Sequence, residues 1–383
     1  MDPIEDKNHP HQCHGDNTLT SNRRRQLRTG LGVIMPLAAI LSGHAAFASD
    51  PLPGDAVAPP ANVNIGIFYD EFNTAGEVGA VHGDSDSKNT HISTNVLVGR
   101  YIRTFDAGGF LSGVQVYVPY ATFLGGQEAG VANIPSPAPG LLPAFGPGSA
   151  NLSHTSGFGQ PNFGAFSFLV NKPETGTYFV VGPWISPPVS SFNKNTNLNP
   201  AQNVWIYEAE AGLRTVLLGT PTTRNLSIEV WGEAYLFGDN NNSALTSPEV
   251  SANNIPPIFS FEHTLNPLIP ATNPLQAAAA TPASFHEQPS EEFRIYLPYE
   301  FLPHMHAFIA PGFFQSFGGK QTYTLRNGET VDSGNRTNET QLRLIASTFL
   351  SPTSQVMVVG DYDVAAHGEP LNRTIELRLL KFF

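Results

Sequence analysis

Cysteine is nearly absent from this sequence: Cys13 is the only one among 383 residues. It lies in an N-terminal stretch that has the features of a removable export signal, so we expect the mature chain to contain neither a disulfide nor a reactive thiol. A chain without cysteine suits passage through an oxidising periplasm, where a free thiol invites incorrect cross-links.

Charged residues are also scarce, and basic residues are fewer than acidic ones. Charged residues make up 14% of the sequence, and the net charge is −12. This balance argues against a basic surface for nucleic acid, so we expect no nucleic-acid partner. The sequence contains 35 glycines and 33 prolines, which is high for a helical chain. The length allows one large closed β architecture.

Residues 1–48 resemble a cleavable signal peptide. Basic residues from Arg23 to Arg28 precede an apolar run at 30–41, which is followed by Ala46-Phe47-Ala48. A charged region, an apolar core and a small-residue cleavage site occur in this order in export signals. The apolar run has roughly a dozen residues, whereas a membrane-spanning helix needs about 20. The consecutive arginines leave a twin-arginine signal open as the alternative.

The chain that follows the signal has no apolar run long enough for a membrane helix. If it lies in a membrane, it must cross as closed strands, because lipid cannot satisfy the open backbone groups of other structures. We therefore expect residues 49–61 to form a short periplasmic segment and residues 62–383 to form an all-β, antiparallel up-and-down transmembrane barrel.

Alternation of apolar and polar residues supports this expectation. In residues 224–237, Leu226 and Ile228 fall on one face, while Glu229 and Trp231 fall on the other. Alternating segments of about ten residues are typical of barrel strands. The same pattern predicts about twelve strands, near residues 62–72, 91–104, 110–122, 158–170, 176–186, 203–217, 224–237, 291–301, 305–317, 338–350, 354–364 and 372–383.

The predicted connections alternate between short and long, as expected for periplasmic turns and extracellular loops. Both termini would then face the periplasm. The two longest predicted loops, 123–157 and 238–290, have a biased composition. They are expected either to fold inward as a constriction or to remain mobile surface loops.

The last strand carries the strongest local signal. Leu377, Leu379 and Phe383 alternate with polar residues, and Phe383 ends the chain. A terminal aromatic after such a strand resembles the sorting signal of Gram-negative outer-membrane barrels, which implies the barrel-assembly machinery as a partner, with outer-membrane lipid and lipopolysaccharide around the barrel. The edge strand of a soluble sandwich is the alternative.

Polar residues on the inward faces of these strands are the candidate lumen lining. Barrel interiors are normally polar. The carboxylates are expected either to pair with arginines across the lumen or to contact a solute, because unpaired buried charge is costly. The candidates are Glu208, Glu210, Arg214, Glu229, Trp231, Glu233, Tyr235, Arg294, Arg343, Glu376 and Arg378.

Motifs for catalysis are not found in the sequence. His304 and His306 have the spacing that places both on one strand face, but they lie beside a short turn at the predicted periplasmic end. Anchoring or hydrogen bonding is favoured there over catalysis or metal binding. No dinucleotide, Walker, nucleophile-elbow or HExxH motif is present. We therefore expect no enzyme, no catalytic residues, no cofactor and no metal.

Several short motifs resemble a family of outer-membrane proteins linked to the MetA (meta-cleavage) pathway of phenol degradation. They are Val118-Pro119-Tyr120, the stretch from Gly157 to Gly164, Asn203-Val204-Trp205, Gly318-Gly319 and Asn327-Gly328, followed by the closing strand. The match covers most of the mature chain. It departs from the expected pattern at Gln160, Pro161 and Ala209.

The resemblance implies an outer-membrane channel that passes small hydrophobic or aromatic molecules into the periplasm. Facilitated diffusion needs no energy-coupling motif, and none is visible. Two alternatives remain open: an outer-membrane barrel hydrolase, and a structural or adhesive barrel without transport.

The export signal leads to a first testable prediction. Protein isolated from outer membranes should begin near Ser49, because cleavage is expected after Ala48. N-terminal sequencing or intact mass measures this directly. Replacing Arg23, Arg24 and Arg25 with lysine should leave export unchanged, since a general export signal needs only positive charge. An uncleaved chain would contradict the signal, and loss of export with lysine would favour the twin-arginine alternative.

Overall fold

The computed structural model describes the chain from Asp50 to its end, with gaps. The described residues are 50–79, 88–131, 148–194, 196, 198–241, 282–325, 328, 330–332, 336, 338–367 and 369–383. No helix among them is long and apolar enough to cross a membrane.

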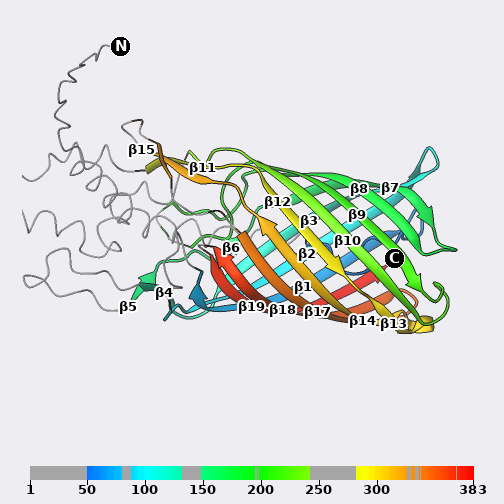
Figure 1. Cartoon of the computed structure of the whole chain (residues 1–383). Helices are drawn as coiled ribbons and strands as arrows, with labels where there is room; N and C mark the ends of the chain where they lie inside the picture. Colours follow the sequence, from blue (N-terminus) through cyan, green and yellow to red (C-terminus); the bar gives the residue numbers. More distant parts are fainter. Residues whose placement is uncertain are drawn as a thin grey trace, which may run out of the picture.

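A closed antiparallel barrel of twelve strands forms the body of the protein (Figure 1). Two of the twelve are interrupted strands, one made of β6 and β7 and the other of β12 and β13. The strands are β1 (Asn64–Val78), β2 (Ile92–Ala107), β3 (Phe110–Phe123), β6 (Gly157–Phe158), β7 (Asn162–Lys172), β8 (Thr177–Ser186), β9 (Ile206–Leu218), β10 (Asn225–Phe237), β12 (Ser290–Tyr296), β13 (Tyr299–Leu302), β14 (Ala307–Phe317), β17 (Asn338–Ser351), β18 (Ser354–His367) and β19 (Pro370–Phe382).

The barrel closes where its first and last strands meet. Ile65 of β1 lies opposite Phe382 of β19, and this pairing continues along both strands. Going round the barrel, each strand pairs with the next barrel strand in the chain, from β1 to β10, then through β12 and β13 to β14, and on to β19. Since each strand has a neighbour on both sides, no edge exposes backbone groups, as a membrane barrel requires. The predicted fold class is therefore confirmed.

Both interruptions lie at prolines. Leu297 and Pro298 separate β12 from β13, and Gly159, Gln160 and Pro161 separate β6 from β7. Proline has no backbone N–H to contribute to a ladder. The alternation predicts one continuous strand in each place, over 158–170 and 291–301, and the local break at proline is the difference.

Short turns lie at one end of the barrel and longer connections at the other (Figure 1). The long connections carry small sheets of their own. One pairs β4 (Gln127–Val131) with β5 (Gly148–Leu152). The other joins β11 (Pro282–Glu287), β15 (Gln321–Leu325) and β16 (Thr330–Asp332). Most of the expected loop 238–290 and the middle of loop 123–157 lie outside the described residues.

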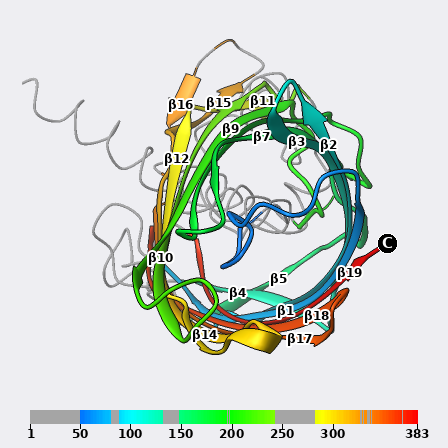
Figure 2. The ribbon, with the colours of Figure 1, turned by 90° about the vertical axis from the view of Figure 1, so that its right-hand side faces the viewer.

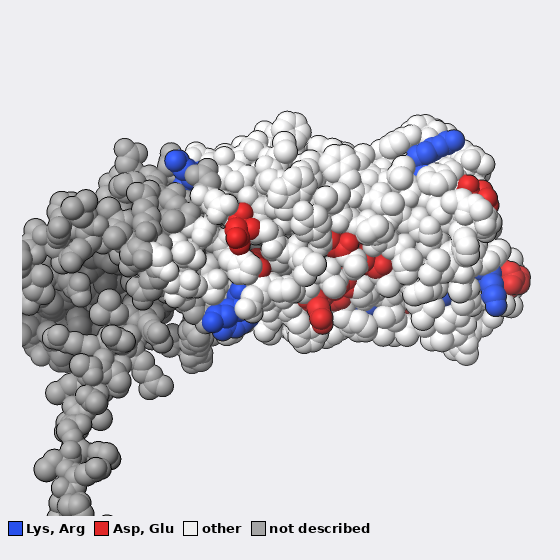
Figure 3. Space-filling model, turned by 90° about the horizontal axis from the view of Figure 1, so that it is seen from above, with Lys and Arg blue, Asp and Glu red and all other residues white. Residues whose placement is uncertain are grey.

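Outward and inward faces differ as the alternation predicted. On β17, Leu342 and Leu344 are 52% and 55% exposed, whereas the residues that alternate with them, Arg343 and Ile345, are 8% and 0% exposed. Figure 3 shows one side of the barrel from outside. Lys and Arg lie near its two ends, and the surface between them is mostly uncharged with a few acidic groups. A band of this kind suits lipid contact.

The expected periplasmic segment is placed differently by the structure. Its described part, from Asp50, runs inside the barrel rather than away from it (Figure 2). Leu52 and Ala56 are 2% and 0% exposed because they pack against the inner wall. The sequence alone gave no sign of this location, since short proline-containing segments are typical of linkers.

The two histidines near the short-turn end also differ from the expectation. They do not share a strand face, because Pro303–Met305 forms a 3₁₀ turn, η2, that includes His304. His306 follows this turn with a left-handed backbone (φ 45°), and β14 begins only at Ala307. His306 Nδ1 lies 2.9 Å from Glu300 Oε1, which agrees with a hydrogen-bonding role.

The two faces lead to a stability prediction. Leu344→Arg places a cation at the middle of β17 on the outward face, where we expect a loss of about 2–4 kcal/mol of unfolding free energy in phospholipid vesicles. Leu350→Arg is the matched control, because Leu350 faces outward at the short-turn end, where the loss should be about 0–1 kcal/mol. Equal losses at the two positions would contradict a membrane-crossing outer face.

Candidate functional site

The candidate site is the barrel lumen together with the segment inside it. We call residues 50–63 the inner segment. It ends at β1, where Thr104 Oγ1 donates a hydrogen bond to Pro60 O (2.8 Å) and accepts one from Val63 N (3.1 Å). Figure 2 shows it crossing the space enclosed by the strands.

One glutamate of the wall holds the middle of the inner segment. Gly54 N and Ala56 N donate to the two carboxylate oxygens of Glu229, at 2.9 and 3.2 Å. Trp231 Nε1 also donates to Glu229 (3.0 Å), and Arg214 lies 3.5 Å away. Gly54 has a φ of +100°, a left-handed conformation that favours glycine. The turn at Gly54 thus presents its backbone N–H groups to a fully buried carboxylate.

Asp55 makes the first of two ionic attachments. Its carboxylate lies 2.6 Å from Arg378 Nη2 and 3.4 Å from Arg100 Nη1. Burial by itself would raise the pKa of Asp55, but the guanidinium groups of Arg378 and Arg100 outweigh burial and lower this pKa below its ordinary value. Asp55 is therefore held as an anion between two cations from strands on neighbouring parts of the wall.

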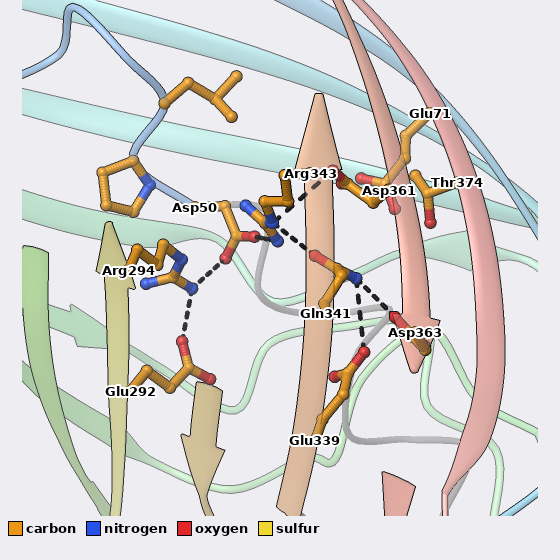
Figure 4. Close-up of polar contacts among 12 residues, drawn as sticks. Asp50, Glu71, Glu292, Arg294, Glu339, Gln341, Arg343, Asp361, Asp363 and Thr374 are labelled. Atoms are coloured by element: carbon orange, nitrogen blue, oxygen red, sulfur yellow. Dashed lines mark hydrogen bonds and ion pairs between the residues drawn. The ribbon is translucent and has the colours of Figure 1, made fainter. Parts of the chain in front are cut away.

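Asp50 makes the second attachment, shown in Figure 4. Its two carboxylate oxygens lie 2.6 Å from Arg294 Nη2 and 2.7 Å from Arg343 Nη2. Tyr296 donates a hydrogen bond to Pro51 O (3.0 Å) and accepts one from Arg343 (3.1 Å). The start of the inner segment is thus joined to β12 and β17 at once.

Polar groups continue from Arg343 along the same side of the lumen. Arg343 donates to Gln341, and Gln341 donates to Asp363 at 2.7 Å. Asp361 lies 3.7 Å from Arg343. Figure 4 shows these groups pointing toward one another from β17 and β18. This network makes one side of the lumen strongly polar.

The predicted lumen residues all lie on inward faces. Ten are buried, and Arg214 is partly buried and contacts Glu229. Their pairing differs in part from the expectation, because the partners of Arg343 and Arg378 include the aspartates of the inner segment. Contact with a solute stays a prediction.

Sequence reasoning missed Asp50, Asp55 and Arg100, the last being a partner of Asp55. Arg100 could have been found, since the alternation on predicted strand 91–104 places it on the same face as Val96 and Val98. The two aspartates carried a weaker signal: they are the only charges between Ser49 and Ala61.

Two small cavities remain beside the inner segment. One of about 120 Å³ is lined by Asp50 and Leu52 and by β2 residues such as Val96. The other, about 100 Å³, is lined by Gly54 and Asp55 and opens toward the short-turn end near Phe382. The inner segment lines both cavities, the first near Asn372 of β19 and the second near its end at Phe382.

Comparison with known families gives a match to the model described as "Putative MetA-pathway of phenol degradation", over residues 70–267, just over half of the chain. The chain belongs to this family. No curated protein sequence matches it.

One solved structure gives the same fold. The chain is similar to the COG4313 outer membrane channel from Pseudomonas putida F1, with a TM-score of 0.63 and 18% identity over 87% of this chain and 100% of that chain. The transport unit of the autotransporter AIDA-I from Escherichia coli matches with a TM-score of 0.41 and 8% identity, over 93% of this chain and 99% of that one. The fold is that of an outer-membrane barrel.

One family-like motif has a clear structural role. Gln160, in the stretch between β6 and β7, is 2% exposed. Its amide nitrogen donates to Val204 O (2.7 Å), and its oxygen accepts from Asn203 N (2.9 Å). The two motifs of the resemblance therefore bind each other, and they position the start of β9, which carries Glu208 and Glu210.

The attachment of Asp55 leads to a pH-dependent prediction. Asp55→Asn leaves Arg100 and Arg378 without their shared anion, and we expect a loss on the order of 3–5 kcal/mol of unfolding free energy at pH 7. Because the pKa of Asp55 is lowered in the folded state, this contribution is present above the ordinary value of 3.8 and is lost as pH falls through the lowered pKa.

Denaturant unfolding of the two proteins between pH 7 and pH 3 measures the difference. Asp106→Asn, at the exposed end of β2, is the control: asparagine can still accept the hydrogen bond from Gly109 N (3.0 Å), so stability should change by less than about 0.5 kcal/mol. A difference between wild type and Asp55→Asn that vanishes near pH 6 would contradict the assignment.

Proposed function

We propose that this protein is an outer-membrane channel that admits small hydrophobic or aromatic molecules by facilitated diffusion, with the inner segment as its closure. The observation that carries the proposal is how the lumen is filled. A twelve-stranded barrel is wider than the eight-stranded barrels whose side chains fill the interior. Here a separate stretch of chain fills it, held by polar contacts at a few points.

The composition of the wall beneath the inner segment favours an apolar solute. Val96, Val98 and Ile102 of β2 face inward and are buried in the same cluster as Leu52 and Ala56. Movement of the inner segment would expose this apolar strip, whose Val96 and Val98 line the same cavity as the polar groups of β17 and β18. A path with one apolar and one polar side suits a small aromatic molecule that carries a hydroxyl group, since pockets for such molecules combine apolar walls with a few polar groups.

An enzymatic role has less support. Two histidine–carboxylate contacts occur among the described residues. His306 meets Glu300 at the short-turn end, and His286 meets Asp239 at the other end, where both side chains are about half exposed. Neither lies in the lumen beside a serine nucleophile or a third acidic group, as hydrolysis would need. We therefore propose that the protein is not an enzyme.

Flux through vesicles tests the channel. Liposomes containing the refolded mature chain should take up phenol-sized aromatic molecules faster than protein-free liposomes. A variant that lacks residues 50–61 should raise this rate several-fold, because it opens the lumen. Asp55→Asn should raise it by a smaller factor, since the contacts of Asp50 remain.

A folded barrel is verified in each case by circular dichroism and by heat-dependent migration on gels. A solute of similar size that carries many hydroxyl groups, such as a small sugar, should enter more slowly than the aromatic molecule, both through the intact chain and through the variant that lacks residues 50–61. Absence of flux above protein-free liposomes from both the intact and the shortened chain would overturn the transport proposal and favour a structural barrel.

A further inference from the structure

Three carboxylates meet on the inner wall beside Arg294, the arginine that also holds Asp50. Glu208 and Glu210 lie on β9, and Glu233 lies on β10 directly opposite Glu210. We call these three residues the acidic trio. One oxygen from each lies within 4.8 Å of the others, and the residues are 6%, 9% and 5% exposed. Like charges placed opposite each other across two strands destabilise a sheet.

The acidic trio has too few cationic partners. Oε1 of Glu208 and Oε1 of Glu233 are buried and have no hydrogen-bond partner in the described part of the chain. Arg294 donates to the other oxygen of Glu233, but the same guanidinium also binds Glu292 (2.5 Å) and Asp50 (2.6 Å). A buried carboxylate without compensation is costly, so positive charge is missing at this place.

We propose that the acidic trio binds one divalent cation of the calcium type. Three carboxylate oxygens form the hard donor set that Ca²⁺ and Mg²⁺ prefer over softer metals. Oxygens on opposite sides of a Ca²⁺ ion stand about 4.6–5.2 Å apart, given ligand distances of 2.3–2.6 Å, whereas the shorter Mg²⁺ distances give about 4.0–4.2 Å. The oxygens of the acidic trio lie within 4.8 Å of one another, a bound that a Ca²⁺ site meets. Carboxylates from two strands also suit the flexible geometry of Ca²⁺ better than the near-ideal octahedron that Mg²⁺ demands.

Solvent can complete the coordination. Glu210 also lines the cavity of about 100 Å³ beside the inner segment. Ca²⁺ accepts six to eight oxygens in irregular arrangements, so water from this cavity can supply those that the protein does not. A bound ion would join β9 to β10. It would also neutralise Glu233, so that Arg294 would have only Glu292 and Asp50 to compensate.

Terbium luminescence is the direct test, because Tb³⁺ replaces Ca²⁺ and is excited through nearby aromatic rings. Tyr235 Oη lies 2.7 Å from Glu233 Oε2, so this ring is close enough to sensitise the ion. We expect the chelator-treated, refolded mature chain to give Tb³⁺ emission that Ca²⁺ displaces at or below ~1 mM, the weak end for extracellular protein sites.

Two variants and one control locate the ion. Glu210→Gln and Glu208→Gln keep the shape of the side chain, and each should lower the Ca²⁺ affinity at least ~10-fold, a loss seen even for residues that only support a metal ligand. Glu376→Gln removes another buried inward carboxyl, on β19, and should leave the affinity unchanged. Having two trio variants keeps the test decisive if one of them fails to fold.

Three outcomes would overturn the proposal. The first is a folded wild type without displaceable Tb³⁺ emission. The second is an equal loss of affinity in Glu376→Gln, which would indicate diffuse binding by acidic groups. The third is a wild-type thermal midpoint that depends on pH but is the same with calcium and with a chelator, which would mean that protons compensate the acidic trio.

Discussion

Closure of the barrel is the constraint on which the other features depend. Backbone groups in lipid must pair with one another, so β19 has to return to β1, where Phe382 lies opposite Ile65. Closing twelve strands encloses more space than inward side chains fill. The interior then needs either water or additional chain, and here residues 50–63 occupy it with Leu52 and Ala56 packed against the wall.

Charge decides how that interior chain is held. Polar inward faces are the counterpart of an apolar outer face, and the arginines among them need anions. Asp50 and Asp55 supply these anions from the inner segment, to Arg294 and Arg378 among others. The inner segment is therefore held both by these ionic attachments and by the apolar packing of Leu52 and Ala56.

Most of the barrel was predictable from the sequence, because the period of two is a local property. Leu377 and Leu379 face outward and Glu376 and Arg378 face inward, as the alternation required. The strand predictions were wrong where a proline interrupts an alternating segment. The break at Pro298 interrupts an otherwise alternating strand, and the turn at His304 depends on Pro303 rather than on spacing.

The sequence by itself led us to expect an export signal at its start, and it predicted a barrel of about twelve strands and which side of each strand faces lipid, because these follow from composition and alternation along neighbouring residues. Only the tertiary structure decided that the inner segment enters the lumen, that Asp50 meets arginines from β12 and β17, and that Glu208, Glu210 and Glu233 meet. Such contacts join residues far apart in the chain or on different strands, and strand register and closure, rather than local pattern, set their distances.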